Sequence, residues 1–264
     1  MHSLTSLTPL GLFLAAATAA SLFWGRALWY LAERSASLRR LVFFLMGFTR
    51  RPMTQVKSML LAFIYCGLGL LAAGLFAIGF GLPGSPGIIP PGPGRFALVI
   101  LGAAGEISLT NLLVDLVCRI PGVGGPQRLA EMNDVPWIKG VRQLPAGLAP
   151  LAAALGGMTE ELFFRGVLQR ILTGRLLVPA LIAILIAGIL FYLEQLLQVQ
   201  TAFQAVVIGC SCVAISAIGG VLVVLTGSIW PALFAHASFV LFFMSQGSET
   251  PATLRHKTTG VASR

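Results

Sequence analysis

The chain has 264 residues, of which 56% are apolar and only 10% charged, and its mean hydropathy is +0.88. These values exclude an ordinary soluble globular domain and indicate a polytopic membrane protein. The formal net charge is +9, but the basic residues lie at the ends of apolar segments, where the positive-inside rule places them. We therefore read the positive charge as a membrane signal and expect no nucleic acid partner.

Seven apolar segments approach the length of about 20 residues that a helix needs to cross a hydrocarbon core of about 30 Å. The apolar part of the fourth is short, because this segment runs into an acidic motif. The sequence predicts an all-α, polytopic transmembrane helical bundle with about seven spans. The predicted spans are Leu10–Leu31, Met59–Leu82, Phe96–Cys118, Leu144–Phe164, Leu176–Leu197, Phe203–Leu225 and Ile229–Met244.

A strongly basic connection follows the first span. It has no acidic residue after Glu33, and its bases are Arg34, Arg39, Arg40, Arg50, Arg51 and Lys57. This excess predicts a cytoplasmic loop. Within it, Leu41–Phe48 is too short to cross the membrane and predicts a helix that lies along the bilayer surface, so that the lipid bilayer is itself a partner.

The segments group into three parts. Residues 1–140 hold the N-terminal transmembrane helices with the basic cytoplasmic loop, and residues 141–246 form a core that carries the acidic motif. Residues 247–264 are polar and are expected to form a disordered tail. The Pro/Gly-rich stretch Pro83–Gly94 predicts a semi-rigid connector outside the membrane.

The orientation of the second half is ambiguous in the sequence. If the first loop is cytoplasmic, Arg165, Arg170 and Arg175 follow the fourth span on the outer side. The basic tail prefers the inner side. Either one of these positive clusters breaks the rule or the fourth segment does not cross fully.

The acidic motif Met158–Gly166 places two carboxylates and a guanidinium in a stretch otherwise apolar enough to lie in lipid. A charge near the bilayer centre costs about 2.5–3.5 kcal/mol on insertion scales, so these groups need partners. Glu161 and Arg165 stand four residues apart on one helix face and are expected to pair. Glu160 points about 100° around the helix, beside Phe164, and remains the unpaired carboxylate. It is a candidate general base, although an ion pair that only fixes helix register is the structural alternative.

Two later spans also carry polar groups. In the fifth, Glu194 and Gln195 follow Phe191, and in the seventh His236 is the only histidine in any predicted span. A histidine in an apolar segment is often a satisfied core residue. Because His236 lies inside a predicted membrane span, a catalytic role is an equal alternative to the structural one.

These elements, in this order and separation, resemble the motifs of the CPBP family, the CAAX protease and bacteriocin-processing intramembrane endopeptidases, also called the Abi family. The first is Glu-Glu-x-x-x-Arg-Gly at Glu160–Gly166, the second begins at Phe191, and the third runs from Ser228 to Ala237 around His236. The similarity covers roughly residues 140–245. The first motif is the most specific, because an aromatic pair and Arg-Gly accompany the two glutamates.

The resemblance implies a hydrolase that cleaves a membrane-anchored peptide or protein within the membrane. It implies that Glu160 activates water for attack on a peptide carbonyl and that Glu161 and Arg165 orient this group. His236 corresponds to the histidine of the third motif, an electrostatic stabiliser. We expect an integral membrane protein of the bacterial cytoplasmic membrane.

Two positions depart from the family pattern. Gln195 stands where the second motif has histidine, and Val240 stands where the third has Asn or Asp. Gln195 can donate hydrogen bonds but cannot take a proton at neutral pH, and Val240 has no polar group. Glu194 lies about 100° around the helix and would need a local distortion to take the missing place. Phe191, Glu194, Gln195 and Val240 are the expected cavity wall.

These departures make catalytic activity uncertain and argue against a metal. A catalytic zinc site usually has three protein ligands, and His236 with Glu160 and Glu194 is a poor set, so we expect no cofactor. Two functions stay open. The first is an intramembrane endopeptidase with Glu160 as base; the second is a pseudoprotease that keeps the cavity and binds a membrane partner without cleaving it.

Overall fold

The computed structural model describes residues 7–82, 92–120, 122 and 130–246. Across these ranges the secondary structure is helical, without a strand, and helices occupy all seven predicted spans. The predicted all-α membrane bundle is therefore confirmed. The predicted disordered tail, residues 247–264, and nearly all of the predicted connector, residues 83–91 of Pro83–Gly94, lie outside the described residues.

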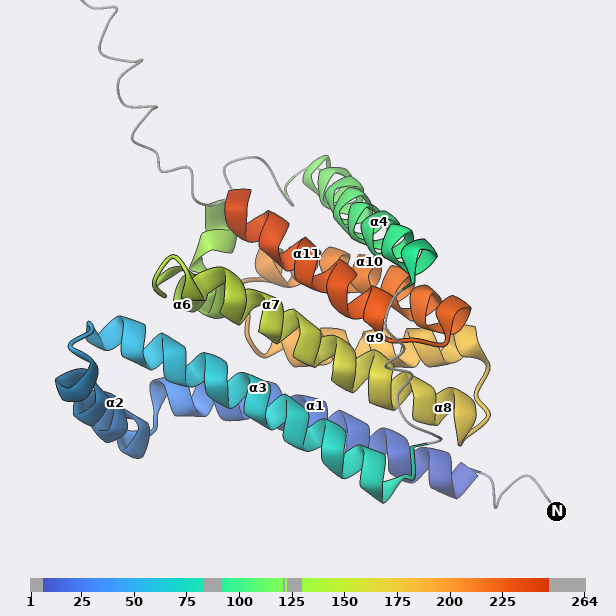
Figure 1. The fold of residues 1–264 in the computed structure, drawn as a ribbon, viewed down its shortest axis with the longest axis horizontal. Helices are drawn as coiled ribbons and strands as arrows, with labels where there is room; N and C mark the ends of the chain where they lie inside the picture. The colour runs from blue at the N-terminus through green and yellow to red at the C-terminus, as the bar shows by residue number, and fades with distance from the viewer. Residues whose placement is uncertain (1–6, 83–91, 121, 123–129, 247–264) are drawn as a thin grey trace, which may run out of the picture.

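Four helices are long and apolar enough to cross a membrane by length and composition: α1 (Leu7–Glu33), α3 (Met53–Gly79), α4 (Pro93–Cys118) and α10 (Ala202–Thr226). Two shorter apolar helices, α9 (Ala180–Leu196) and α11 (Trp230–Gln246), fill the fifth and seventh predicted spans. All six run lengthwise through the molecule in Figure 1.

The fourth predicted span is longer than its apolar part suggests. Helix α7 (Leu148–Glu161) continues without a break into the π-helix η2 (Leu162–Gln169) and then into α8 (Arg170–Gly174). This continuous rod carries the acidic motif. The η2 segment contacts α3, α7, α8, α9 and α10, so the motif lies in the middle of the bundle.

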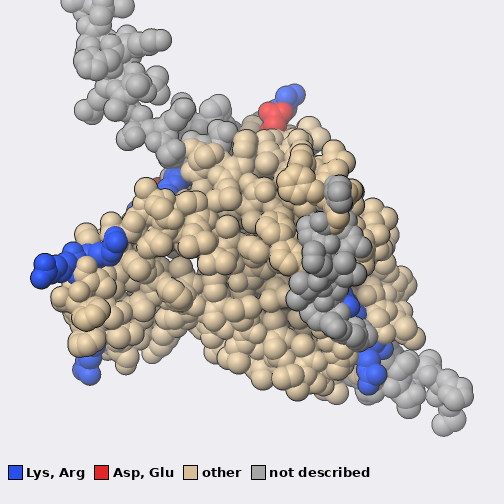
Figure 2. All heavy atoms as spheres, in the orientation of Figure 1, with Lys and Arg blue, Asp and Glu red and all other residues tan. Residues whose placement is uncertain are grey.

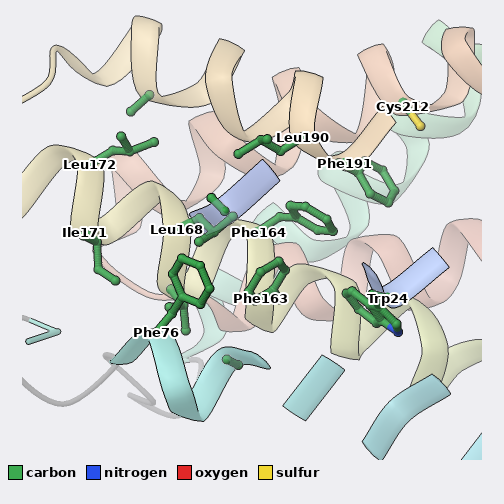
Figure 3. Close-up of a cluster of buried hydrophobic side chains, with 14 of the residues drawn as sticks. Trp24, Phe76, Phe163, Phe164, Leu168, Ile171, Leu172, Leu190, Phe191 and Cys212 are labelled. Carbon is green, nitrogen blue, oxygen red and sulfur yellow. The ribbon is translucent and has the colours of Figure 1, made fainter. Parts of the chain in front are cut away.

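The core forms around the aromatic pair of the motif. Phe163 and Phe164 are fully buried, and Trp24 of α1 contacts both, edge-on to Phe163 and stacked on Phe164. On its other side Phe164 meets Phe191 of α9, with 5.2 Å between ring centroids. Figure 3 shows Phe163 and Phe164 of η2 with Trp24 and Phe191 nearby. Aromatic packing of this kind fixes the rotation of the rod, and with it the directions of the charged side chains.

The basic loop contains the predicted surface helix, α2 (Ala36–Thr49). Ser35 caps its start, since the Ser35 Oγ accepts a hydrogen bond from the Leu38 amide at 3.1 Å. Leu38 and Val42 are buried against neighbouring helices, whereas the opposite face is exposed and carries Leu41, Phe43, Phe44 and Phe48. An apolar face turned outward is what a helix in the lipid interface requires.

The ends of the rods define two ends of the molecule. The short helices η1 (Ala130–Asp134) and α6 (Pro136–Arg142) lie beside the first turns of α3 and α10. Figure 1 shows α2 and α6 at one end and α8 at the other. Figure 2 shows Lys and Arg gathered near the ends, with mostly uncharged surface between them. The fourth segment therefore runs the full length of the bundle.

Candidate functional site

The predicted site residues come from four elements that meet at the middle of the bundle. Glu160 and Glu161 are the last residues of α7, and Arg165 follows one turn later in η2. Gln195 lies near the end of α9, and His236 lies in α11. Both α11 and η2 contact α7. A π-helical segment directly after two buried acids is notable, because such segments often occur at functional sites.

Glu161 and Arg165 form the pair that their four-residue spacing predicts. Arg165 Nη1 lies 3.0 Å from Glu161 Oε1, and both side chains are at most 1% exposed. Arg165 Nη2 donates a hydrogen bond to Ser216 Oγ of α10 at 2.7 Å. The guanidinium lies 4.9 Å from the centre of the Phe191 ring. The buried cation is thus compensated by an acid, a hydroxyl and an aromatic face.

Glu160 is held differently from its neighbour. Its Oε1 accepts a hydrogen bond from the Tyr65 hydroxyl and a second from Gln195 Nε2 at 3.1 Å. Its Oε2 faces His236 Nε2 at 3.6 Å, which is beyond hydrogen-bond length. One oxygen of Glu160 is therefore occupied by two donors, while the other is directed towards the histidine ring.

His236 lies between the two glutamates. Its Nδ1 is 3.1 Å from Glu161 Oε1, and its Nε2 faces Glu160. The ring is 2% exposed and packs edge-on against Phe191 and Phe239. Because Glu161 fixes the Nδ1 side, the other ring nitrogen is directed into the space beside Glu160. The same acid thus orients both Arg165 and His236.

Glu194 is linked to the site through the side chain of Gln195, a contact that helix geometry alone did not predict. The Gln195 Nε2 atom donates to Glu194 Oε2 at 2.9 Å as well as to Glu160 Oε1. Glu194 is fully buried, and Gln198 Nε2 donates to its other oxygen. Helix α9 stays α-helical through Leu196. The local distortion that Glu194 would need to take the missing place is therefore absent, and the Gln195 amide links Glu194 to the site instead.

Val240 lies one turn after His236 and offers no polar atom. A Cβ added at Gly157 of α7 would lie 3.3 Å from both the His236 ring and Val240. The glycine therefore allows α11 to approach α7 closely enough for His236 to reach both glutamates. Glu160 is only 9% exposed, so its surroundings form a tightly packed buried cluster.

Two contributing residues escaped prediction from the sequence. Tyr65 of α3 reaches Glu160, and Trp24 stacks on Tyr65 at 4.7 Å and donates from Nε1 to the Tyr65 carbonyl oxygen. Ser216 of α10 reaches Arg165. A tyrosine near the middle of a span, away from the interfaces that tyrosine prefers, is the one signal that marked Tyr65.

The residues present do not fit a catalytic metal. In the described ranges, His, Cys, Asp and Glu form no group of three or more suited to hold an ion. His236 directs its two nitrogens towards two different glutamates, and both oxygens of Glu194 accept amide hydrogen bonds. A zinc site needs about three ligands that converge on one point.

Comparison with known proteins finds a similarity for the part of the chain that carries the site. Residues 142–242 match the family model described as Rce1-like, type II CAAX prenyl endopeptidase Rce1-like. Searches of curated proteins and of solved structures gave no match. The matched segment contains all three motifs, from Glu160 to His236. The match confirms the resemblance: residues 142–242 are similar to the Rce1-like family of CAAX prenyl endopeptidases, in a chain with four helices that are long and apolar enough to cross a membrane.

Proposed function

We propose that this protein is an intramembrane endopeptidase in which Glu160 activates the water that hydrolyses a peptide bond of a membrane-anchored peptide or protein. One observation carries the proposal. Glu160 Oε1 is held by Tyr65 and Gln195, whereas Oε2 faces His236 across 3.6 Å. A general base needs a fixed carboxylate with one oxygen left for water, and Glu160 has a fixed carboxylate whose Oε2 has no hydrogen-bond donor within 3.5 Å among the described residues.

The proposed reaction needs only the groups of this cluster. Glu160 Oε2 takes a proton from water, and the hydroxide attacks the peptide carbonyl. When the C–N bond breaks, the same carboxyl returns the proton to the leaving amine. His236 Nε2 faces the same space. In the doubly protonated ring, Nδ1–H donates to Glu161 and Nε2–H stabilises the negative charge that develops on the carbonyl oxygen. Water is consumed and the carboxyl is regenerated, so the cycle is balanced.

The remaining charged residues support this pair. Glu161 holds the His236 ring by Nδ1, and Arg165 neutralises Glu161 while it is anchored by Ser216. Orientation of a catalytic histidine by a buried carboxylate is a recurring arrangement in hydrolases. In this proposal Glu161 and Arg165 do not touch the substrate.

The loss of a polar group at Val240 lowers the expected rate. Removal of one oxyanion donor costs about 10²–10³ in turnover in enzymes where it has been measured. We therefore expect slow turnover, which is compatible with cleavage of a tethered substrate at high local concentration in the membrane.

A second candidate function rests on the same two departures. Gln195 and Val240 replace the polar residues of the family pattern, and either change favours a pseudoprotease that binds a membrane-anchored partner without cleaving it. Both functions imply a membrane-anchored protein as the partner, in a bacterial cytoplasmic membrane.

The two functions separate in one experiment. The protein is reconstituted in liposomes with a library of membrane-anchored reporter peptides, and products are identified by mass spectrometry. Cleavage by the wild type that is lost in Glu160→Gln supports the endopeptidase. A reporter that stays intact but co-purifies equally with both proteins supports the pseudoprotease and overturns the endopeptidase.

A further inference from the structure

The carboxyl of Glu194 is a buried acid beside the site that the proposed reaction leaves unused. It is fully buried in α9 and makes no ion pair with a described residue. Two side-chain amides satisfy it instead, Gln198 at 2.5 Å and Gln195 at 2.9 Å. Burying a carboxyl group costs free energy unless its hydrogen bonds are made, and the two amides make them here. The presence of a carboxyl at this buried position, rather than an apolar side chain, still needs an explanation.

The hydrogen bonds of the Gln195 amide provide this explanation. A primary amide nitrogen carries two N–H donors, and Gln195 Nε2 directs them to two carboxyl groups, Glu194 and Glu160. If the amide were rotated by half a turn, its carbonyl oxygen would face both carboxyl oxygens and repel them. Glu194 therefore selects the orientation in which Gln195 donates to Glu160.

We propose, on the basis of the proposed function, that Glu194 is a positioning residue that acts on Glu160 through Gln195. The acid keeps the amide nitrogen directed at Glu160 Oε1, and this leaves Oε2 for the water. In this chain the second motif does not supply a proton acceptor. It supplies a hydrogen-bond link that fixes the general base.

A double-mutant cycle on reporter cleavage tests this chain of contacts. Glu194→Leu is expected to lower kcat about tenfold without changing KM, the effect of one buried charge-assisted hydrogen bond. Glu194→Gln keeps an acceptor oxygen and is expected to recover most of the rate. In a Gln195→Leu background, Glu194→Leu should have no further effect. Additive losses in the double variant would overturn the proposal, since a purely structural residue acts independently of the amide.

Two controls separate this proposal from the proposed function. If Glu160→Gln keeps full activity, the proposed function fails. If Glu160→Gln is inactive and the Glu194 effect is additive, only the positioning role fails. An activity-independent readout is thermal stability in detergent. Glu160→Gln and Glu194→Leu should be coupled when Gln195 is present and uncoupled in Gln195→Leu, whereas equal coupling in both backgrounds would contradict the link.

A second, independent observation concerns the cavity at the junction of α1, α2 and α3. It has a volume of about 200 Å³, and its wall includes the acid Glu33 and the bases Arg39 and Lys57 together with the apolar Leu38 and Val42. Within the described part of the chain none of these three charges forms an ion pair with another. Opposite charges that line a cavity without pairing leave room for a ligand that carries both signs.

The position of this cavity indicates the kind of ligand. Helix α2 turns Phe43, Phe44 and Phe48 outward, which places its outer face at the level of the lipid interface. Around it the exposed bases Arg40, Arg50 and Arg51 favour phosphate groups. A membrane lipid headgroup is therefore the ligand that reaches this cavity at the highest concentration.

We infer that the cavity binds a phospholipid headgroup with both a phosphate and a primary ammonium, as in phosphatidylethanolamine. Arg39 and Lys57 would hold the phosphate, and Glu33 would accept hydrogen bonds from the ammonium. A choline headgroup has no N–H to donate to Glu33, and a glycerol headgroup has no cation. The mixed charge of the wall therefore selects among lipids.

Native mass spectrometry of the protein from mixed phosphatidylethanolamine, phosphatidylcholine and phosphatidylglycerol nanodiscs tests this site. We expect retained phosphatidylethanolamine, with the preference over phosphatidylcholine lost in Glu33→Gln and all headgroup retention reduced several-fold in Arg39→Gln/Lys57→Gln. Lys139→Gln is the matched control, because Lys139 pairs with Asp134 outside the cavity. Equal retention of the three lipids, or loss in the control as well, would overturn the site. So would a preference for phosphatidylglycerol that Glu33→Gln leaves unchanged.

Discussion

At the scale of single residues, Glu160 and Glu161 illustrate how neighbouring acids acquire different surroundings. They are adjacent in sequence, but a turn of about 100° directs one to Tyr65 and Gln195 and the other to Arg165. Glu161 is the acid with the permanent cation. Glu160 keeps one oxygen without a close donor, and the proposed chemistry rests on this difference.

The hydrogen bond from the Tyr65 hydroxyl to Glu160 can be tested by removing the hydroxyl. Tyr65→Phe removes one of the two donors on Glu160 Oε1 and keeps the stacking on Trp24. Loss of a hydrogen bond to a charged group costs about 1.5–3 kcal/mol, so kcat should fall about 10- to 100-fold. Steady-state cleavage of a reporter measures it. Unchanged kcat would show that Tyr65 does not hold the base.

Arg165 and Glu160 should differ in their effect on stability. Arg165→Ala leaves Glu161 buried without its cation, and breaking such a pair costs about 3–5 kcal/mol. Glu160→Gln keeps the size of the side chain and should change the unfolding free energy little. Denaturation of the purified protein in mixed micelles compares the two. Similar losses in both variants would mean that the whole cluster serves only the fold.

At the scale of elements, the rod from α7 through η2 to α8 carries the site, and α11 closes over it. Gly157 lets the two approach, since a Cβ there would lie 3.3 Å from Val240 and from His236. With Glu160 9% exposed, a peptide can reach its carboxylate only when helices around α7 separate. Substrate entry therefore requires movement of packed elements.

A cross-link between α7 and α11 should block that movement. A Cβ at Gly157 would lie 3.3 Å from Val240 Cγ2, so these two positions are suited to an engineered disulfide. The oxidised Gly157→Cys/Val240→Cys variant should lose cleavage that reduction restores. The two single variants control for crowding at His236. Full activity in the oxidised protein would show that substrate enters elsewhere.

Local periodicity predicted much of this arrangement, and long-range packing explains what it missed. The spans follow from runs of apolar residues, and the Glu161–Arg165 pair follows from spacing within one helix. The Tyr65–Glu160 contact joins residues 95 positions apart, and the Glu194 link depends on how α9 rotates against α7. Each of these contacts joins residues of different helices, so a motif within a single segment could not predict them.

At the scale of the whole molecule, the full-length fourth rod removes one of the alternatives that the sequence left open, an incomplete crossing by the fourth segment. Arg165 is buried in an ion pair and is therefore no topology signal. Arg170 opens α8 and Arg175 directly follows it, at the end of the molecule opposite α2. The dominant basic end, with Arg39, Arg40 and Arg51, is the one that the positive-inside rule assigns to the cytoplasm.

Site-directed thiol labelling in intact cells checks this orientation. In a background with the four native cysteines replaced by serine, Arg175→Cys should react with a membrane-impermeant reagent. Arg51→Cys should react only after permeabilisation, because both side chains are exposed but at opposite ends of the bundle. The reverse pattern would invert the topology, and labelling of both from one side would contradict a complete crossing by the fourth segment.

The most direct measurement of the central claim is the cleavage rate of one reporter by wild type and by Glu160→Gln in the same liposomes, with equal folded protein confirmed by thermal unfolding. Because the amide cannot take a proton from water, we predict that the variant loses at least about 10²–10⁴ in rate, the usual contribution of a general base. Cleavage by Glu160→Gln within a few-fold of wild type would contradict the role of Glu160.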